Sequence, residues 1–382
     1  MAFLGGGRIS EGTRIDWVAF AAALALSCLG LLTMNSFVGA DPYFIRQVLW
    51  LIVSVIAFFV AASIDWRILR RSGVAAGIYG VACALLFLLI VLGSTVKGAQ
   101  SWFSLGFAAF QPVELAKLAL IVVLAKYFSR RHIEIAHIRH ILISGAYALI
   151  LFVVVALQPD FGSAIVIFLI WLGMVLISGI SRRHLLIVFS IGLVAFAGLW
   201  FFGFKDYQKE RVLTFLHPLA DVRGAGYNAY QSTIAVGSGG IFGKGIGYGT
   251  QSKLRYLPEY QTDFIFAAFA EEWGFVGVAL LFALYSLLFS RIIAAARRGA
   301  TNFETLFAFG ILFYFCAHFL LHVGINLGLL PVTGTTIPFM SYGGSHLLVE
   351  FTSLGILCGM SRYAASSGRD QSSAEWSGGY DR

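Results

Sequence analysis

Ten apolar segments, each long enough to cross a lipid bilayer as a helix, restrict the fold of this chain more than any other feature. A transmembrane helix needs about 20 mostly apolar residues. Of the 382 residues, 59% are hydrophobic and only 12% are charged, so a water-soluble domain could not bury the apolar surface. We therefore predict an all-α polytopic membrane protein. The expected spans are residues 16–37, 46–64, 74–93, 112–128, 141–158, 162–180, 184–203, 264–290, 303–324 and 346–361.

The distribution of positive charge predicts which side of the membrane each end of the chain occupies. Sixteen of the 27 Lys and Arg residues lie in the two terminal tails and in the loops after the second, fourth, sixth and eighth spans. The short loops on the opposite side, 39–46, 94–111 and 325–345, hold only Arg46 and Lys97. Because short cytoplasmic loops are enriched in Lys and Arg, both termini are predicted to be cytoplasmic. This pattern accounts for the net charge of +8 without a nucleic-acid-binding face.

We expect a single integral membrane domain, residues 1–362, followed by a Ser- and Gly-rich cytoplasmic tail, 363–382, that is disordered. One long outer loop, 204–263, joins the seventh and eighth spans and contains two short amphipathic stretches. The outer loop 325–345 is rich in Pro and Gly yet largely uncharged. Such backbone is tolerated at membrane depth where protein or a watery cavity covers it. This loop is predicted to be re-entrant-like, with a plain surface turn as the alternative.

The long outer loop contains the glycine-rich stretch "GSGGIFGKGIGYGT". It does not fit a nucleotide-binding loop, because Lys244 is followed by Gly245 and not by Ser or Thr. Glycine N–H groups together with Lys244, Lys253 and Arg255 suit an anion such as a diphosphate. The alternative is a flexible loop with solvated lysines.

Ionisable residues inside the spans are candidates for function, because a charge in hydrocarbon costs at least about 2.5–3.5 kcal/mol. Glu114 and Lys117 are three residues apart, so they share one helix face and can pair. Asp160 lies at the turn into the sixth span, where its alternative role is a helix N-cap. Asp263 lies at the start of the eighth span, at the seam between the outer loop and the membrane.

Further charged and histidine residues are predicted to line a polar, outward-opening cavity together with these: Glu271, Glu350, His318 and His322. The two histidines are spaced i,i+4, which binds a metal only with a third ligand, and we expect a hydrogen-bonded pair instead. The four cysteines form no CxxC or Cys/His cluster, and no dedicated metal site is expected. Glu272 points to another helix face and is expected to serve helix packing.

Four stretches occur together in this order: "GAQSWFSLGFAAFQPVELAKL", "QPDFGSAIV", "AYQSTIAVGSGGIFGKGIGYGTQSKLRYLPEYQTDFIFAAFAEEWGFVG" and "LLPVTGTTIPFMSYGGS". In them the chain resembles the SEDS family (shape, elongation, division and sporulation), most closely its RodA branch and less its FtsW branch. The resemblance implies a ten-helix bundle that polymerises lipid II into glycan strands for cell elongation and shape. It also implies a site on the outer (periplasmic) face of the bacterial inner membrane. The partners it implies are a class B penicillin-binding protein and other membrane proteins of the elongation complex.

The resemblance also carries the family's functional residues onto three positions. The essential aspartate of the "TDFIFA" motif falls on Asp263, and the Glu/Lys pair of the "QPSELAK" motif falls on Glu114 and Lys117. The chain departs from the family at Val113, where Ser is usual. It departs again at Gln261, where His is usual, so a proton-transfer role for that histidine is not expected here.

The reaction that the resemblance implies suggests a role for each candidate. A sugar hydroxyl displaces a lipid-linked diphosphate with inversion, which requires a base and stabilisation of the leaving group. Asp263 is the expected base, with Lys117 orienting it or contacting the diphosphate and Glu114 holding Lys117. Asp160, Gln251 and Ser341 are added to the loop residues as substrate-binding candidates. Mg²⁺ pairs naturally with diphosphate, so a divalent cation is left open.

Two other classes of function remain as alternatives. Buried charges in a polar cavity also fit a flippase or transporter of lipid-linked precursor. The position of the acidic groups in the outer half of the bundle argues against it, because alternating access places binding groups near the midplane. The third class is a scaffold with a vestigial cavity.

Overall fold

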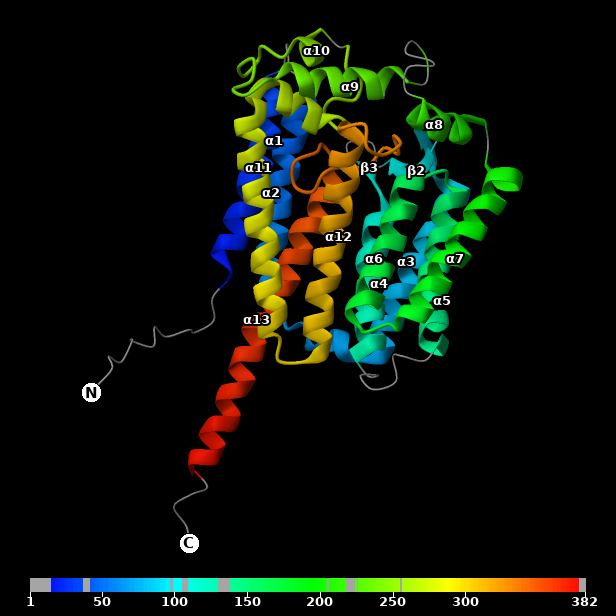
Figure 1. Cartoon of the computed structure of the whole chain (residues 1–382). Coiled ribbons are helices and arrows are strands. Elements are labelled where there is room, and N and C mark those ends of the chain that lie inside the picture. Colours follow the sequence, from blue (N-terminus) through cyan, green and yellow to red (C-terminus); the bar gives the residue numbers. More distant parts are fainter. Residues whose placement is uncertain are drawn as a thin grey trace, which may run out of the picture.

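Long helices that run side by side form most of the molecule (Figure 1). The computed structural model describes residues 15–36, 42–96, 99–104, 109–129, 138–204, 206–217, 224, 226–254 and 256–377. In chain order the elements are α1 (Trp17–Asn35), α2 (Pro42–Ser63), η1 (Trp66–Arg70), α3 (Ser72–Leu92), β1 (Ser94–Val96), β2 (Ala99–Ser104), β3 (Ala109–Phe110), α4 (Pro112–Ser129), α5 (Ile138–Leu157), α6 (Phe161–Ile177), α7 (Arg182–Gly198), η2 (Leu199–Gly203), α8 (Asp206–Leu216), α9 (Tyr227–Ser238), α10 (Thr250–Lys253), α11 (Ile265–Arg298), α12 (Asn302–Asn326) and α13 (Gly344–Ser377).

Each of the ten predicted spans falls on a helix. Within the described residues, seven helices are long and apolar enough to cross a membrane: α1, α2, α3, α5, α7 with η2, α11 and α12. The other three predicted spans fall on α4, which carries three charged residues, on α6, which has 17 residues, and on α13. The prediction of an all-α polytopic membrane protein is confirmed, whereas the number of crossings and the orientation stay predictions.

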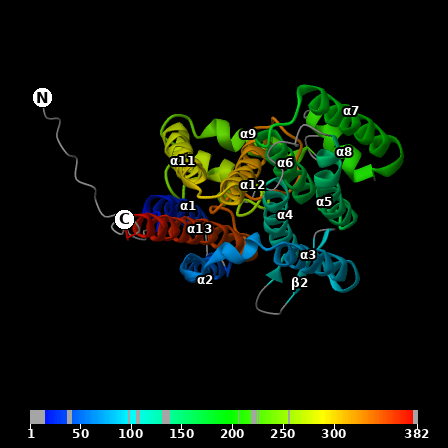
Figure 2. The ribbon, with the colours of Figure 1, turned by 90° about the horizontal axis from the view of Figure 1, so that it is seen from below.

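Viewed along the bundle, the helices form two groups (Figure 2). One group contains α1, α2, α11, α12 and α13, and the other contains α3 to α7. The groups meet where α12 packs against α4 and α6. This junction brings the charged residues of α4 next to α12 and α13.

The loops that the charge pattern predicts to be outer hold more secondary structure than the sequence predicted. β1, β2 and β3 form a small antiparallel sheet between α3 and α4, with Ser94 opposite Trp102 and Phe103 opposite Phe110. The sheet was not predicted, because strands of two to six residues carry little alternation to detect. The two amphipathic stretches of the long loop are helices α8 and α9, as predicted, and α9 lies across one end of the bundle (Figure 1).

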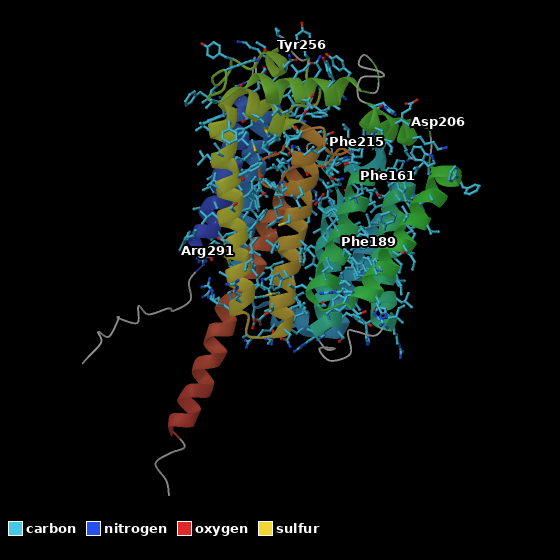
Figure 3. All side chains as sticks on the ribbon, in the orientation of Figure 1. Phe161, Phe189, Asp206, Phe215, Tyr256 and Arg291 are labelled. Atoms are coloured by element: carbon cyan, nitrogen blue, oxygen red, sulfur yellow. The ribbon has the colours of Figure 1, made fainter. Side chains whose placement is uncertain are left out.

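The two ends of the bundle are marked by Tyr256, in the loop before α11, and by Arg291, near the other end of α11 (Figure 3). Arg291 pairs with Asp16 at 2.8 Å, and Asp16 also caps α1 by accepting from the N–H of Ala19. A carboxylate at a helix N-terminus is favourable, and here it also anchors α1 to α11.

The segment between α12 and α13 has irregular backbone, and its second half, residues 335–343, is mostly buried. Thr335, Ile337 and Phe339 are at most 4% exposed. The Pro338 carbonyl accepts a 2.6 Å hydrogen bond from the hydroxyl of Tyr285 on α11, so side chains satisfy backbone groups that regular structure would otherwise pair. Leu327 and Leu329, at the start of the segment, are 38% and 66% exposed. The re-entrant-like interpretation of residues 325–345 therefore stays a prediction, with the surface turn as its alternative.

The C-terminal tail differs from the prediction. α13 continues to Ser377, beyond residue 362, where the membrane domain was expected to end. Figure 1 shows this last part of α13 projecting away from the other helices. A helix nucleated inside the bundle extends without a second nucleation step, which composition alone does not capture. Residues 378–382, the rest of the predicted disordered tail, lie outside the described residues.

Replacing Tyr285 by Phe should lower the thermal stability of the protein in detergent. The change leaves the Pro338 carbonyl without its donor in a fully buried place, at a cost of about 1–3 kcal/mol. Tyr248→Phe is the matched control, because the Tyr248 side chain is 70% exposed. An unchanged melting temperature for Tyr285→Phe would contradict a stabilising role of this hydrogen bond.

Candidate active site

The predicted pair of Glu114 and Lys117 lies at the junction of the two helix groups. Lys117 Nζ is 2.8 Å from Glu114 Oε1 and 3.1 Å from Nε2 of His318 on α12. The other oxygen of Glu114 accepts a 2.8 Å hydrogen bond from the hydroxyl of Tyr314, also on α12. The pairing is confirmed, and Tyr314 is a member that the sequence reasoning missed because an apolar helix carries many aromatic residues.

Helix α13 completes this group through His346 and Glu350. His346 Nδ1 lies 3.0 Å from Glu114 Oε2, and its Nε2 lies 2.9 Å from Glu350 Oε1. Glu350 Oε2 accepts from the N–H of Phe339 at 2.8 Å. Only a doubly protonated imidazole can donate to carboxylates on both sides. The arrangement therefore suits two cations, Lys117 and His346, alternating with two anions.

These side chains do not line the predicted outward-opening cavity. Five of the predicted residues are at most 3% exposed: Glu114, Lys117, His318, His322 and Glu350. Four of them lie in the α4–α12–α13 group, which we call the buried charge network, and His322 lies one turn further along α12. The sequence could not separate the two cases, because a buried charge is stabilised either by water in a cavity or by an opposite charge at contact distance.

The network also contains a set of donors that could hold a metal. Ligand atoms of Glu114, His318 and His346 lie within 4.8 Å of one another. However, the Lys117 ammonium is already within hydrogen-bonding distance of Glu114 and His318, where the metal would have to lie. Two imidazoles and one carboxylate also do not suit Mg²⁺, which prefers oxygen ligands. The residues of this network therefore do not fit the cation that the sequence left open.

Asp263, the predicted base, lies in the turn before α11. Its N–H donates to the Glu259 carbonyl at 3.1 Å, and its own carbonyl accepts from the side chain of Asn326 at 2.9 Å. The carboxylate lies against Gly334: a Cβ built on that glycine would be 3.5 Å from Asp263 Oδ2. Gly334 has a φ of +75°, which glycine adopts without strain. Asp263 itself is half-buried.

One short segment, residues 334–336, connects Asp263 with the buried charge network. Gly334 contacts the Asp263 carboxylate, and the Thr336 carbonyl lies 3.0 Å from Nδ1 of His318. His318 in turn contacts Lys117 through its other nitrogen. The network is thus placed to hold the backbone against which Asp263 rests.

Asp160 is an N-cap, as its structural alternative predicted. Its Oδ1 accepts from the N–H of Ser163 at 3.0 Å, and its Oδ2 accepts from the side chain of Gln111 at 3.2 Å. Burial raises the pKa of Asp160, and the positive charge of Lys117 opposes that rise. Gly162, two residues after Asp160, packs on Thr335, so the start of α6 lies against the same segment that Asp263 lies against.

The glycine-rich loop is clamped to α11 by the two adjacent glutamates. The Glu271 carboxylate, with no exposed surface, lies 2.7 Å from Lys244 Nζ and accepts from the N–H of Gln251 at 3.1 Å. Glu272 Oε1 accepts from the N–H of Gly247 at 2.9 Å. Glu272 Oε1 also accepts a 2.6 Å hydrogen bond from the hydroxyl of Ser36 at the end of α1. Glu272 therefore joins α11 to α1, in line with the predicted packing role, and in addition fixes the loop, which was not predicted.

A bend in α11 makes the clamp possible. Gly274 has φ 64° and ψ −165° inside the helix, values that glycine tolerates best. Just after it, the N–H groups of Phe275 and Val276 donate to the carbonyls of Gly240 and Ile241 in the loop. Helical periodicity could not show this, because it presumes an unbroken helix.

The remaining loop candidates differ in how accessible they are. Lys244 is engaged with Glu271, whereas Lys253 is exposed and lies over the ring of Tyr248 at 5.8 Å. Ser341 is only 2% exposed, and its hydroxyl donates to the Thr262 carbonyl at 3.0 Å. Ser341 therefore braces the backbone beside Asp263 and is not placed to bind substrate. Arg255 lies outside the described residues.

A family model and several known proteins match this chain over most of its length. A family model for FtsW, RodA and SpoVE, described as "Cell cycle protein", matches residues 15–366. Peptidoglycan glycosyltransferase MrdB of Escherichia coli K12 is 38% identical over 354 residues, 91% of this chain and 93% of that protein. Stage V sporulation protein E of Bacillus subtilis is 35% identical over 371 residues, 93% of this chain and 99% of that protein.

Solved structures show the same architecture. A chain of a peptidoglycan synthase complex that coordinates polymerization and crosslinking aligns with a TM-score of 0.79 at 32% identity. That alignment covers 92% of this chain and 98% of the other. Rod shape determining protein RodA of Thermus thermophilus aligns with a TM-score of 0.69 at 30% identity, over 91% of this chain and 97% of that one.

Breaking the buried ion pair on one side should destabilise the fold more than replacing both partners. Lys117→Met leaves the Glu114 carboxylate short of a cation in a place without water, at a cost of about 3–5 kcal/mol. The double variant Glu114→Gln with Lys117→Met removes both charges and should unfold at a higher temperature than the single variant. Thermal unfolding in detergent checks this order. A double variant that melts below the single one contradicts it.

Releasing the clamp should loosen the glycine-rich loop without unfolding the bundle. Glu271→Gln removes the charge that holds Lys244 and weakens the bond to the N–H of Gln251. Hydrogen exchange of residues 239–252 should then become at least about 10-fold faster while that of α12 stays unchanged, because the opening is local. Lys253→Met, at an exposed lysine, is the control. Unchanged exchange in the Glu271→Gln loop would argue against the clamp.

Proposed function

This chain belongs to the FtsW/RodA/SpoVE family of peptidoglycan glycosyltransferases, and we propose that it polymerises lipid II into glycan strands for cell elongation and shape. It is a membrane protein of the same architecture as RodA, and the relatives named above match it over nearly their whole length. We place its chemistry on the outer face of the bacterial inner membrane. This placement rests on the predicted orientation, in which the loop before α11 faces outward.

The observation that carries the proposal is the position of the Asp263 carboxylate. It lies where the loop before α11 enters that helix, half-buried and next to Gly334. A lipid-linked sugar presents its reacting atoms at this depth. In the proposed reaction the 4-hydroxyl of the acceptor sugar attacks C1 of the donor sugar as Asp263 accepts the hydroxyl proton. The C1–oxygen bond to the diphosphate breaks, and the configuration at C1 inverts.

We assign the buried charge network a supporting role in this reaction. Lys117 has no exposed surface, so in this conformation it does not contact substrate. Lys117 contacts His318, and His318 contacts the Thr336 carbonyl. Lys117 therefore helps to hold the segment that contacts Asp263. Glu114 keeps Lys117 charged and in place.

The leaving diphosphate requires positive charge at the outer surface. Exposed Lys253 and, from the sequence, Arg255 are the proposed contacts, while Asp160 and Gln251 stay secondary candidates. A divalent cation such as Mg²⁺ would be held mainly by the oxygens of the diphosphate, because the described residues near Asp263 include no ready oxygen cage for it. The cation would neutralise charge that develops on the leaving group.

We further propose that a class B penicillin-binding protein is the partner. A similar solved structure is a complex that coordinates polymerization with crosslinking, and crosslinking of glycan strands is transpeptidase chemistry. Other membrane proteins of the elongation complex are additional proposed partners.

Replacing Asp263 by Asn should abolish polymerisation while leaving folded protein. Loss of the base should lower the rate by at least about 100-fold. The measurement is the yield of glycan strands from lipid II in detergent, with the purified protein and its transpeptidase partner. Glu259→Gln, four residues earlier in the same turn, is the matched control and should keep the wild-type rate.

The same assay separates the glycosyltransferase from a flippase or a scaffold. Detergent offers no bilayer to cross, so long glycan strands can come only from polymerisation. Wild-type rates in folded Asp263→Asn protein would contradict the role of Asp263. Absence of strands from the wild-type complex, together with transport of lipid II in vesicles, would favour the flippase.

A further inference from the structure

Asn326, the last residue of α12, is buried and uses both ends of its side-chain amide. The side chain has no exposed surface. Its Oδ1 accepts from the N–H of Ala267 at 3.0 Å. Its Nδ2 donates to the carbonyls of Asp263 at 2.9 Å and His322 at 2.8 Å. Both amide hydrogens are used, so the orientation of the side chain is fixed by the contacts themselves.

One of these contacts supplies a cap that α11 otherwise lacks. The first N–H groups of a helix have no partner inside the helix. The residue before α11, Phe264, has no side chain that can accept a hydrogen bond, and Ala267 is the third residue of the helix. Asn326 therefore caps α11 from a different helix.

We propose that Asn326 is a positioning residue that fixes the Asp263 main chain and thereby aims its carboxylate. The carbonyl of Asp263 and the N–H of Ala267 lie on either side of the first turn of α11, and one amide holds both. The carboxylate then has little freedom except rotation about its own side-chain bonds. This inference rests on the proposed function, in which Asp263 is the base.

The last turns of α12 also hold the segment at residues 334–335, which lies next to the Asp263 carboxylate. His322 Nδ1 lies 2.7 Å from the Thr335 carbonyl, next to the glycine that contacts the Asp263 carboxylate. His322 also supplies a carbonyl to the Asn326 amide. The end of α12 is itself anchored, because the Ser232 hydroxyl on α9 donates to the Asn326 carbonyl at 2.9 Å. Helix α9 therefore holds Asn326 in place, and Asn326 in turn holds the main chain of Asp263.

The chemistry of the amide explains why this position suits asparagine. A carboxylate at position 326 could still accept from the N–H of Ala267 but would face the Asp263 and His322 carbonyls with an acceptor. Alanine would leave all three backbone groups without their partner. A shift of about 1 Å in a reacting group can lower a rate about 100-fold, so even a small relaxation of this turn should be visible in catalysis.

The test is Asn326→Asp, which keeps the volume and the helix cap but removes the donor to Asp263. We expect kcat for lipid II polymerisation to fall by about 10- to 100-fold, with KM within about twofold of wild type. Asn302→Asp is the matched control, because it makes the same change at the exposed first residue of α12, at the opposite end of the helix from Asn326. It should keep kcat within about twofold of wild type.

Each outcome decides the proposal. Folded Asn326→Asp with wild-type kcat overturns it, as does an equal loss of kcat in Asn302→Asp. If Asn326→Asp does not fold, Asn326→Ser, whose hydroxyl can still donate to one carbonyl, should fold with reduced kcat and unchanged KM. Failure of both variants to fold overturns the proposal in favour of a purely structural role. Asp263→Asn and the wild-type complex are run in parallel. Absence of strands from the wild-type complex contradicts the proposed function itself, and wild-type rates in Asp263→Asn contradict the role of Asp263. An inactive Asp263→Asn beside a fully active Asn326→Asp contradicts only the positioning.

Discussion

The ion pair of Glu114 and Lys117 is the interaction on which the rest of the structure depends. A lysine without exposed surface between membrane helices has to be neutralised where it lies, because desolvation of a charge costs several kcal/mol. Glu114, 2.8 Å away, does this. The remaining charge and hydrogen-bonding capacity of the pair then require His318, Tyr314 and His346, and these contacts join α4 to α12 and α13.

The irregular segment between α12 and α13 likewise needs partners from the surrounding helices. Its backbone cannot pair with itself as a helix would, so it depends on side chains of the surrounding helices. His318, His322 and Glu350 supply contacts to Thr336, Thr335 and Phe339. The same segment contacts the Asp263 carboxylate at Gly334. Charge burial, loop conformation and the proposed base are therefore parts of one arrangement.

The arrangement suggests a division of labour among the charged residues. Asp263 is half-buried at the edge of the outer loop, whereas the network residues are closed off from solvent. Glu271 and Glu272 hold the glycine-rich loop, and Glu271 engages Lys244. Lys253, by contrast, is exposed and is a proposed contact for the diphosphate. In the proposed reaction, a residue near the membrane surface can react with the substrate, whereas a buried residue keeps the reacting residue in place.

The sequence by itself determined the helices, the pairing of Glu114 with Lys117 and the position of Asp263 at the start of a predicted span, and it offered the cap at Asp160 as one of two roles. All of these follow from local spacing, because apolar length, an i,i+3 interval and a residue before a helix need no distant partner. Only the tertiary structure decided that the predicted cavity residues form a closed network, that Glu272 holds a loop and that Asn326 caps α11. Those roles come from contacts between residues far apart in the chain, such as the 201 positions between Lys117 and His318, which sequence spacing does not encode.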